Sequence, residues 1–251
     1  MNPALDALDK SLAVIELALR AKAKPRLVER LARATPKSLR DSRKRIERLL
    51  PKARALYRKV AKRGKAAKIP KALTQLLDAL SQKVKDITGD LEGGGLTAAQ
   101  WVDDMEDLLA EYYTAARMAG AGTDALTADA LDELAHRVGV QADFLKNFEI
   151  EIQDSAEFMA GWNARAEQYA AGIKTAYWDG VTEVLPLPAM PGEGTQCLNN
   201  CNCAWRIEPV DADAGDYDCF WEWEPDSAHC QTCIERHEQW YPLQIRGFEV
   251  Q

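Results

Sequence analysis

Six cysteines gathered near the C-terminal end of this 251-residue chain constrain its fold more than any other feature. The last two, Cys230 and Cys233, form a Cys-X-X-Cys knuckle, a spacing at which two thiolates bind one tetrahedral zinc ion. In a reducing compartment such a cluster is typical of metal ligation, whereas disulfides are typical of oxidising compartments. The sequence therefore predicts a small module stapled by structural Zn²⁺ in this part of the chain.

Two strand-like runs lie between the first cysteines and the knuckle. CAWRIEPV and YDCFWEWE are rich in β-branched and aromatic residues, and the acidic turn DADAGD separates them. Together they predict a β-hairpin. Because side chains alternate along a strand, Cys219 shares a face with Trp221 and Trp223 and is expected to belong to the core.

Because a hairpin reverses the direction of the chain, its two ends lie side by side, and the knuckle is expected to lie close to the earlier cysteines. This gives five candidate ligands for four positions: Cys197, Cys201, Cys203, Cys230 and Cys233. His229 is a further candidate beside the knuckle. The alternatives to zinc are thiols without metal, disulfides, and a redox-active Cys-X-X-Cys pair.

Helical periodicity dominates the chain before residue 185. One apolar stripe follows the three-and-four spacing of a buried helix face, and it consists of Leu73, Leu76, Leu77, Leu80, Val84 and Ile87. Gly89 is expected to cap that helix. Thr97 and Gln100 predict a capping box at the start of the next helix. Earlier in the chain, Pro51 is expected to break the basic helical run that precedes the apolar stripe.

Leu131, Leu134 and Val138 mark a shorter helix, and a longer one runs from Phe158 toward Tyr177. The proline-rich run VLPLPAMPGEG then ends the helical pattern. We predict a mainly α fold, with a long helical body followed by a small zinc-stapled β-hairpin module. The expected domains are a basic helical arm (1–71), an acidic helical domain (72–184), and a proline-rich linker with a cysteine-rich, zinc-ribbon-like module (185–251).

The net charge of −7 conceals a strong asymmetry along the chain. Residues 20–71 hold 21 of the 32 Lys and Arg residues and only three acidic ones. Such an arm suits a phosphate backbone, duplex DNA above all, or an acidic protein surface. The candidate contact residues are Arg43, Lys44, Arg45, Arg48, Lys52 and Arg54. Ordinary solvated helix faces are the alternative interpretation.

Motifs of catalysis and membrane insertion are missing from the sequence. It has three histidines and contains no Walker loop, GxGxxG, HExxH or GxSxG motif, so we expect no enzyme and no small-molecule substrate. A metal site filled by four cysteines also leaves no open position for a reacting water. The chain shows no signal peptide and no apolar run of membrane-spanning length, which predicts a soluble, unsecreted protein without a membrane partner.

Two segments carry a resemblance to a known family. LPLPAMPGEGTQCLNNCNCAWRIE and AHCQTCIERHEQWYPL resemble the C-terminal segment of phage head morphogenesis proteins, the minor head or Mu protein F-like group. The helices from LTAAQW through GWNARAEQYAAGIKTAY are similar to that group's helical region, so the resemblance covers roughly residues 96–243. The family pattern is Asn-Cys-Arg-Cys, often preceded by a histidine. Here Asn202 replaces the arginine, Leu198 stands in the histidine's place, and Cys197 is the candidate to fill the gap.

The resemblance implies a minor structural protein of a phage or prophage. Such a protein is present in few copies and acts in prohead assembly near the portal or inside the shell. Its expected partners are the portal and major capsid proteins, and its expected location is the virion head, assembled in the host cytoplasm. The alternative function is nucleic-acid binding through the basic arm and a zinc ribbon.

Overall fold

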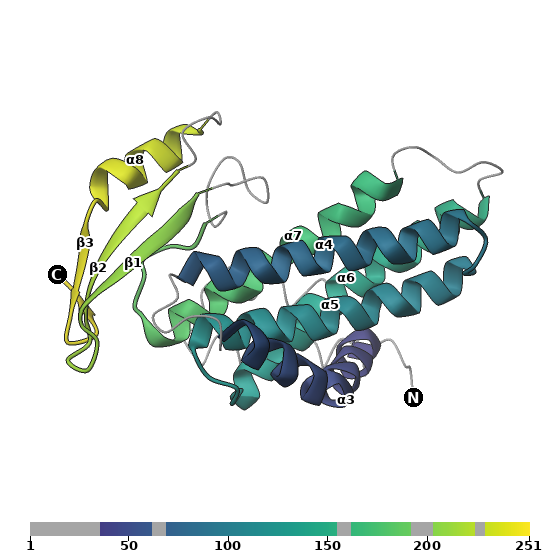
Figure 1. The fold of residues 1–251 in the computed structure, drawn as a ribbon, viewed down its shortest axis with the longest axis horizontal. Coiled ribbons are helices and arrows are strands. Elements are labelled where there is room, and N and C mark those ends of the chain that lie inside the picture. Colours follow the sequence, from purple (N-terminus) through teal and green to yellow (C-terminus); the bar gives the residue numbers. More distant parts are fainter. Residues whose placement is uncertain (1–35, 62–68, 155–161, 192–202, 224–228) are drawn as a thin grey trace, which may run out of the picture.

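The computed structural model describes residues 36–61, 69–154, 162–191, 203–223 and 229–251. A bundle of long helices lies beside a small sheet (Figure 1). The bundle consists of α3 (Pro36–Ala61), α4 (Ile69–Glu92), α5 (Ala98–Ala121), α6 (Ala128–Asp154) and α7 (Trp162–Val184). The predicted mainly helical architecture is therefore confirmed.

Helix α5 is the centre of the bundle, because α3, α4, α6 and α7 all pack against it. It starts with the predicted capping box, in which the Thr97 side chain accepts a hydrogen bond from the Gln100 amide and the Gln100 side chain accepts one from the Thr97 amide. Each bond satisfies an amide that the first helical turn leaves without an intrahelical partner.

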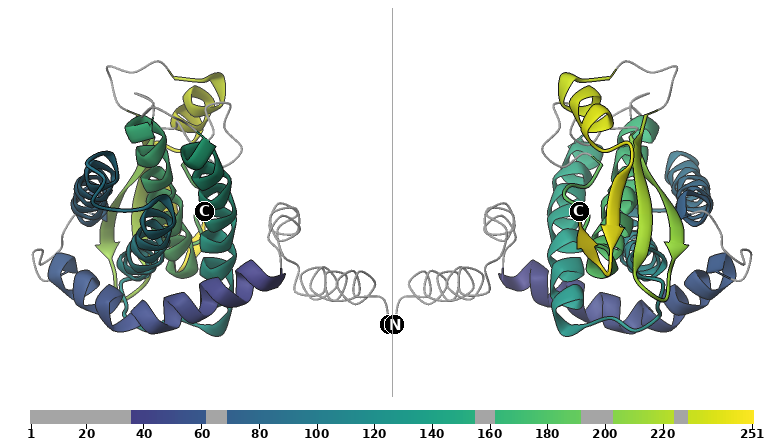
Figure 2. Two further views of the ribbon diagram at one scale, coloured as in Figure 1. Left: turned by 90° about the vertical axis from the view of Figure 1, so that its right-hand side faces the viewer. Right: turned by 90° about the vertical axis from the view of Figure 1, so that its left-hand side faces the viewer.

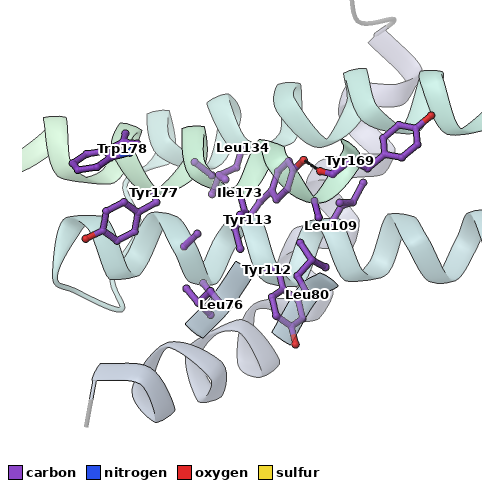
Figure 3. Close-up of a cluster of buried hydrophobic side chains, with 14 of the residues drawn as sticks. Leu76, Leu80, Leu109, Tyr112, Tyr113, Leu134, Tyr169, Ile173, Tyr177 and Trp178 are labelled. Carbon is purple, nitrogen blue, oxygen red and sulfur yellow. Dashed lines mark hydrogen bonds between the residues drawn. The ribbon is translucent and has the colours of Figure 1, made fainter. Parts of the chain in front are cut away.

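The core of the bundle is built from apolar and aromatic side chains of α4, α5, α6 and α7 (Figure 3). Its labelled members are Leu76, Leu80, Leu109, Tyr112, Tyr113, Leu134, Tyr169, Ile173, Tyr177 and Trp178. Tyr113 is fully buried, and its hydroxyl donates a hydrogen bond to the Tyr169 carbonyl over 2.6 Å. The phenol is thus accommodated in the core without an unsatisfied polar atom.

The backbones of α5 and α7 meet at two glycines. A Cβ added to Gly120 would come within 2.0 Å of the Tyr177 carbonyl oxygen, and one added to Gly180 would come within 2.1 Å of the Arg117 carbonyl oxygen. Such an approach is possible only where both helices lack a side chain. The glycines therefore set how closely the two central helices pack.

A buried ion cluster lies beside this crossing. Arg117 has only 4% of its side chain exposed and pairs with Glu133, Asp179 and Glu183. Arg137 pairs with the same Asp179 carboxylate. Because a buried guanidinium is stable only when its charge is compensated, these pairs favour one relative position of α5, α6 and α7.

Two expected helix boundaries are wrong. Helix α3 continues through Pro51, although a proline inside a helix costs about 3 kcal/mol. Ile46 and Leu49 before it, and Ala53 after it, are buried in the common core, so packing on the body outweighs this cost. Helix α4 likewise passes Gly89 and ends at Glu92.

The turn after α4 shows why Gly89 does not cap it. The Gly93 amide still donates to the Gly89 carbonyl, and the left-handed backbone, with φ of 72°, occurs at Gly94. A helical glycine costs less than about 1 kcal/mol relative to alanine, too little to end a helix whose stripe is buried. The stripe itself is confirmed, with Leu76, Leu80 and Val84 buried.

Helix α6 runs well beyond the short helix expected around Leu134, as far as Asp154. Residues 155–161, which include the expected start of the longer helix at Phe158, lie outside the described ranges. Helix α7 ends at Val184, where the proline-rich run begins, as predicted. In the part of the chain that the structure describes, no helix combines the length and apolarity needed to span a bilayer.

The C-terminal module is a four-stranded antiparallel sheet with one helix. Its sheet order is β1-β2-β3-β4. The elements are β1 (Ala204–Asp211), β2 (Asp216–Glu222), α8 (Gln231–Gln239), β3 (Leu243–Arg246) and β4 (Glu249–Val250). The predicted hairpin is confirmed as β1 and β2, while α8, β3 and β4 are additions that the sequence pattern did not predict.

The proline-rich segment after α7 joins the body to the module through buried contacts. Leu185, Leu187 and Ala189 are buried while the two prolines between them are exposed, an alternation typical of extended chain. The Trp205 indole of β1 donates to the Ala189 carbonyl over 2.8 Å. Helix α4 also contacts β1, so the sheet packs against one end of the bundle (Figures 1 and 2).

Candidate functional site

The Cys230–Cys233 knuckle stands at the start of α8. Cys230 is the N-cap residue, Cys233 is in the first turn, and their Sγ atoms lie 3.5 Å apart. This separation is far longer than a disulfide bond of about 2.05 Å. Two thiolates on one tetrahedral zinc ion, each about 2.3 Å from the metal, would be separated by about 3.8 Å. The pair therefore fits two adjacent ligand positions.

A stack of rings fixes the knuckle against the end of β2. The Trp223 ring stacks on His229 at 5.0 Å and on His237 at 4.1 Å between centroids. His229 directly precedes Cys230, so the knuckle is drawn to the place where β2 ends. In the strand register Ala204 faces Glu222, and Cys203, next to Ala204, therefore lies at this same end of the hairpin.

Of the remaining candidate cysteine ligands, the structure describes only Cys203. Cys197 and Cys201 lie outside the described residues, and Cys203 is buried just ahead of β1. Within the described ranges no three His, Cys, Asp or Glu side chains form a group that could hold a metal ion. The ligand set of five cysteines thus stays a prediction, with one pair at a ligand-like distance.

Cys219 occupies a different environment from the knuckle. It lies in the middle of β2, between Ile207 of β1 and Leu243 of β3, and is fully buried. Burial raises the pKa of its thiol to about 12, and the neighbouring Asp218 carboxylate acts in the same direction. A thiol that resists ionisation is a poor zinc ligand, since metal binding requires the thiolate. Its burial beside Trp221 agrees with the predicted strand alternation.

His237 has a role that the sequence pattern did not predict. Its Nδ1 lies 2.6 Å from the Trp221 carbonyl oxygen, and because a carbonyl only accepts, Nδ1 carries the proton and donates. The Trp221 amide in turn donates to the Trp240 carbonyl over 3.0 Å. Both bonds tie the C-terminal end of α8 to β2. The spacing of four residues between Cys233 and His237, which places both on one helix face, is the signal in the sequence.

The candidate contact residues of the basic arm lie on α3, and Arg43, Arg45 and Arg48 among them pair with acidic side chains of the same chain. Arg45 pairs with Asp103, Glu106 and Asp107 of α5. Other guanidinium contacts with the body are those of Arg43 with Asp132, Arg48 with Asp107, Arg54 with the Asp124 carbonyl, and Arg58 with the Asp124 carboxylate. These arginines therefore dock α3 on the bundle.

Two members of the candidate set differ from these arginines. Lys44 is exposed, and no ion pair involves it among the described residues. Lys52 is exposed as well, but its charge lowers the pKa of Glu111, which burial raises. Whether the set contacts nucleic acid or another protein stays a prediction.

Glu106 is the most enclosed acid of this contact between α3 and α5. Its side chain is 10% exposed, and its Oε2 lies 2.8 Å from Nη2 of Arg45. Burial raises the pKa of Glu106, and the charges of Arg45 and Lys146 offset only part of that rise. The contact thus holds a carboxylate whose desolvation is incompletely compensated.

Comparison of the chain with protein-family models, with curated proteins and with solved structures finds no match.

Proposed function

We propose that this chain is a minor head or head morphogenesis protein of a phage or prophage, with a structural rather than a catalytic role. It acts during prohead assembly, near the portal or inside the shell, and is carried in the virion head. Its partners are the portal and major capsid proteins. The support is the resemblance of the cysteine-containing segments to that family, together with the looser similarity of the helices from LTAAQW through GWNARAEQYAAGIKTAY, so that the resemblance covers roughly residues 96–243.

The C-terminal module is proposed to be stapled by one structural zinc ion. The observation that carries this part is the Cys230–Cys233 pair, with its Sγ atoms 3.5 Å apart at the start of a helix. The positive end of a helix favours anionic groups such as thiolates. The other ligands come from Cys197, Cys201 and Cys203, which precede the hairpin whose open end holds the knuckle.

A zinc ion would supply a cross-link that the module's own contacts do not provide. In the described chain the module buries seven apolar or cysteine side chains: Cys203, Trp205, Cys219, Trp221, Cys233, Leu243 and Ile245. Small sheets with so few buried side chains are marginal in water. Structural zinc contributes about 10–16 kcal/mol of apparent binding free energy, which is sufficient to hold them folded.

Metal analysis of the purified full chain tests the zinc proposal. We expect about one zinc per chain, together with loss of the near-ultraviolet circular dichroism of the Trp205, Trp221 and Trp240 cluster on chelation. The far-ultraviolet signal of the bundle should persist. A metal content well below one per chain, with a chelator-insensitive tryptophan signal, contradicts the proposal.

The assembly role is tested separately at the gene. Terminase and portal genes should lie beside the gene for this chain, and deleting it from the phage or inducible prophage should reduce the yield of infectious particles. Electron microscopy should then show defective heads, and a supplied copy of the gene should restore them. A locus without head genes, or normal heads after deletion, argues against the role whatever the zinc content.

A further inference from the structure

Most cations of α3 fall into two groups that differ in position. Those that contact acidic side chains of the bundle are arginines: Arg43, Arg45, Arg48 and Arg58. Those that are exposed and have no ion pair among the described residues are Lys37, Arg40, Lys44, Lys52 and Lys59, although the charge of Lys52 lowers the pKa of Glu111. Arg54, which donates to the Asp124 carbonyl, belongs to neither group. The second group is available to an outside partner without the loss of an ion pair of the described residues.

Three cations of the second group line one face of α3. Lys37, Arg40 and Lys44 are spaced by three and four residues, so they share a side of the helix. We call these three residues the outer stripe. They span about 10 Å of helix axis, which equals the rise of about three base pairs. Asp41 is the acidic residue exposed on the same turns, so the stripe keeps a net positive charge.

The rest of the bundle lies on the opposite side of α3. Ile46, Leu49 and Ala53 are buried against the body, and α3 packs on α5 and α6. Figure 2 shows α3 crossing the other helices, which lie to one side of it. The outer stripe therefore faces away from the body.

The paired arginines change the electrostatics beneath the stripe. Residues 72–251 hold 33 acidic and 10 basic residues, and a polyanion is repelled by such a surface. Arg43 and Arg45 neutralise Asp132, Glu106 and Asp107 directly under α3. A polyanion that approaches the outer face of α3 thus meets bundle acids whose charges are already paired with arginines.

The side-chain chemistry agrees with this division. The planar guanidinium of arginine suits fixed, multidentate pairing with carboxylates, as Arg45 shows with three acids. Lysine carries a mobile, hydrated point charge, which suits phosphate contacts that do not depend on base sequence. The sequence on both sides of α3 is also basic, with six Lys or Arg at 20–35 and four at 62–68.

We propose that the outer stripe of Lys37, Arg40 and Lys44 binds the phosphate backbone of duplex nucleic acid without sequence preference. This function is additional to the proposed assembly role and does not depend on the zinc module. Arg43 and Arg45 pair with acids of the bundle and do not contact the duplex. The three cations are exposed and have no ion pair among the described residues, and the basic stretches on both sides of α3 extend the positive charge as a phosphate backbone requires.

Fluorescence anisotropy of a labelled DNA duplex of about 20 base pairs against the full chain tests the proposal. The variant combines Lys37→Gln, Arg40→Gln and Lys44→Gln. Each lost phosphate contact lowers the steepness of log K against log salt by about 0.9, so the slope should become shallower by about 2.7. Between about 50 and 200 mM salt the wild type should then lose about 40-fold more affinity than the variant.

Two matched variants serve as controls. Lys71→Gln, Lys83→Gln and Lys85→Gln remove the same charge from α4 and should leave the slope unchanged. Lys37→Arg, Arg40→Lys and Lys44→Arg keep the charge and should retain the wild-type slope. Circular dichroism checks that every variant keeps its helix content, which is expected because the three outer-stripe residues are exposed.

Three results would overturn the proposal. They are a wild type that does not bind duplex at low salt, an outer-stripe variant with an unchanged slope, and an equal loss in the α4 control. Sedimentation velocity tests the rival hypothesis that the outer stripe binds a second copy of this chain. If the outer-stripe variant loses a salt-sensitive self-association while its DNA binding is intact, the stripe binds the acidic surface of a second copy and the nucleic-acid proposal is wrong.

Discussion

The helical body and the C-terminal module are each stabilised by a different set of interactions. In the body, α5 packs against four helices, and its buried face runs from Trp101 to Ala121. In the module, a sheet with strands as short as two residues packs a tryptophan cluster, and the module also carries the cysteines that the structure places. Both belong to one continuous apolar cluster.

This difference shows how the size of a core determines what else a fold needs. Stability that comes from burial grows with the number of surrounded side chains, and the body has many. The module has few, and it adds ring stacking, the hydrogen bonds of His237 and Trp240, and the proposed metal. The two regions should therefore respond differently to the same kind of perturbation.

The largest effect is expected from Cys233→Ala, which removes one side of the knuckle. If zinc holds the module, this variant loses the metal and with it about 10 kcal/mol or more of apparent binding free energy. The tryptophan near-ultraviolet signal should disappear while the helical signal remains. Cys219→Ala is the matched control, because Cys219 lies in mid-strand and should retain full zinc content. Equal zinc loss from both variants would contradict the division between ligand and core cysteine.

The next largest effect is expected in the body, from Gly120→Ala. The new methyl would meet the Tyr177 carbonyl oxygen at 2.0 Å, so α5 and α7 must separate, at a cost of about 1–3 kcal/mol. Urea unfolding followed at the helical signal measures it. Gly89→Ala is the control, because nothing lies within 4 Å of its added Cβ, and it should stabilise by about 0.5–1 kcal/mol. An unchanged free energy of unfolding for Gly120→Ala would show that the crossing of α5 and α7 is loosely packed.

A smaller effect is expected from Thr97→Ala, which removes the capping box of α5. The amide of Gln100 loses its side-chain acceptor, and the body should lose about 1 kcal/mol. Thr97→Ser keeps the hydroxyl and should retain most of that stability. Thermal unfolding of the three proteins gives the comparison. An unchanged midpoint for the alanine variant would mean that α5 is held by tertiary contacts alone.

The smallest effect is the pH dependence contributed by Glu106. Burial raises the pKa of Glu106 in the folded state above its unfolded value of 4.5, so the folded state takes up the proton more readily. The cost of the buried charge is present above the folded pKa and is relieved as pH falls through it. Relative to Glu106→Gln, the wild type should therefore gain stability on acidification toward the unfolded pKa. If the free energies of unfolding of the wild type and of Glu106→Gln, measured with urea, change in parallel over about pH 4 to 7, this contribution is ruled out.

Local patterns in the sequence were sufficient for several elements. The capping box at Thr97, the buried stripe of α4 and the β1–β2 hairpin depend on residues a few positions apart. The alternation that buries Cys219 and Trp221 is of the same kind. The short strands β3 and β4 and helix α8 were missed, because two to nine residues carry too little periodicity to be recognised.

The errors at Pro51 and Gly89 have a common cause. Both residues disfavour a helix interior locally, and in both helices the flanking apolar residues are buried in the common core or packed against it. Tertiary packing therefore outweighed a local preference worth a few kcal/mol or less. Sequence alone does not show which helices will provide that packing.

The amino-acid sequence by itself determined the order of the two regions, the helical character of the body, the hairpin and the clustering of the cysteines. Each of these follows from short-range spacing or composition. Only the tertiary structure decided which cations of α3 pair with the body and which remain exposed. It also decided how closely α5 and α7 approach at Gly120 and Gly180. The physical reason is that charge pairing and backbone contact depend on distances between residues far apart in the chain, and these distances exist only after the helices have packed.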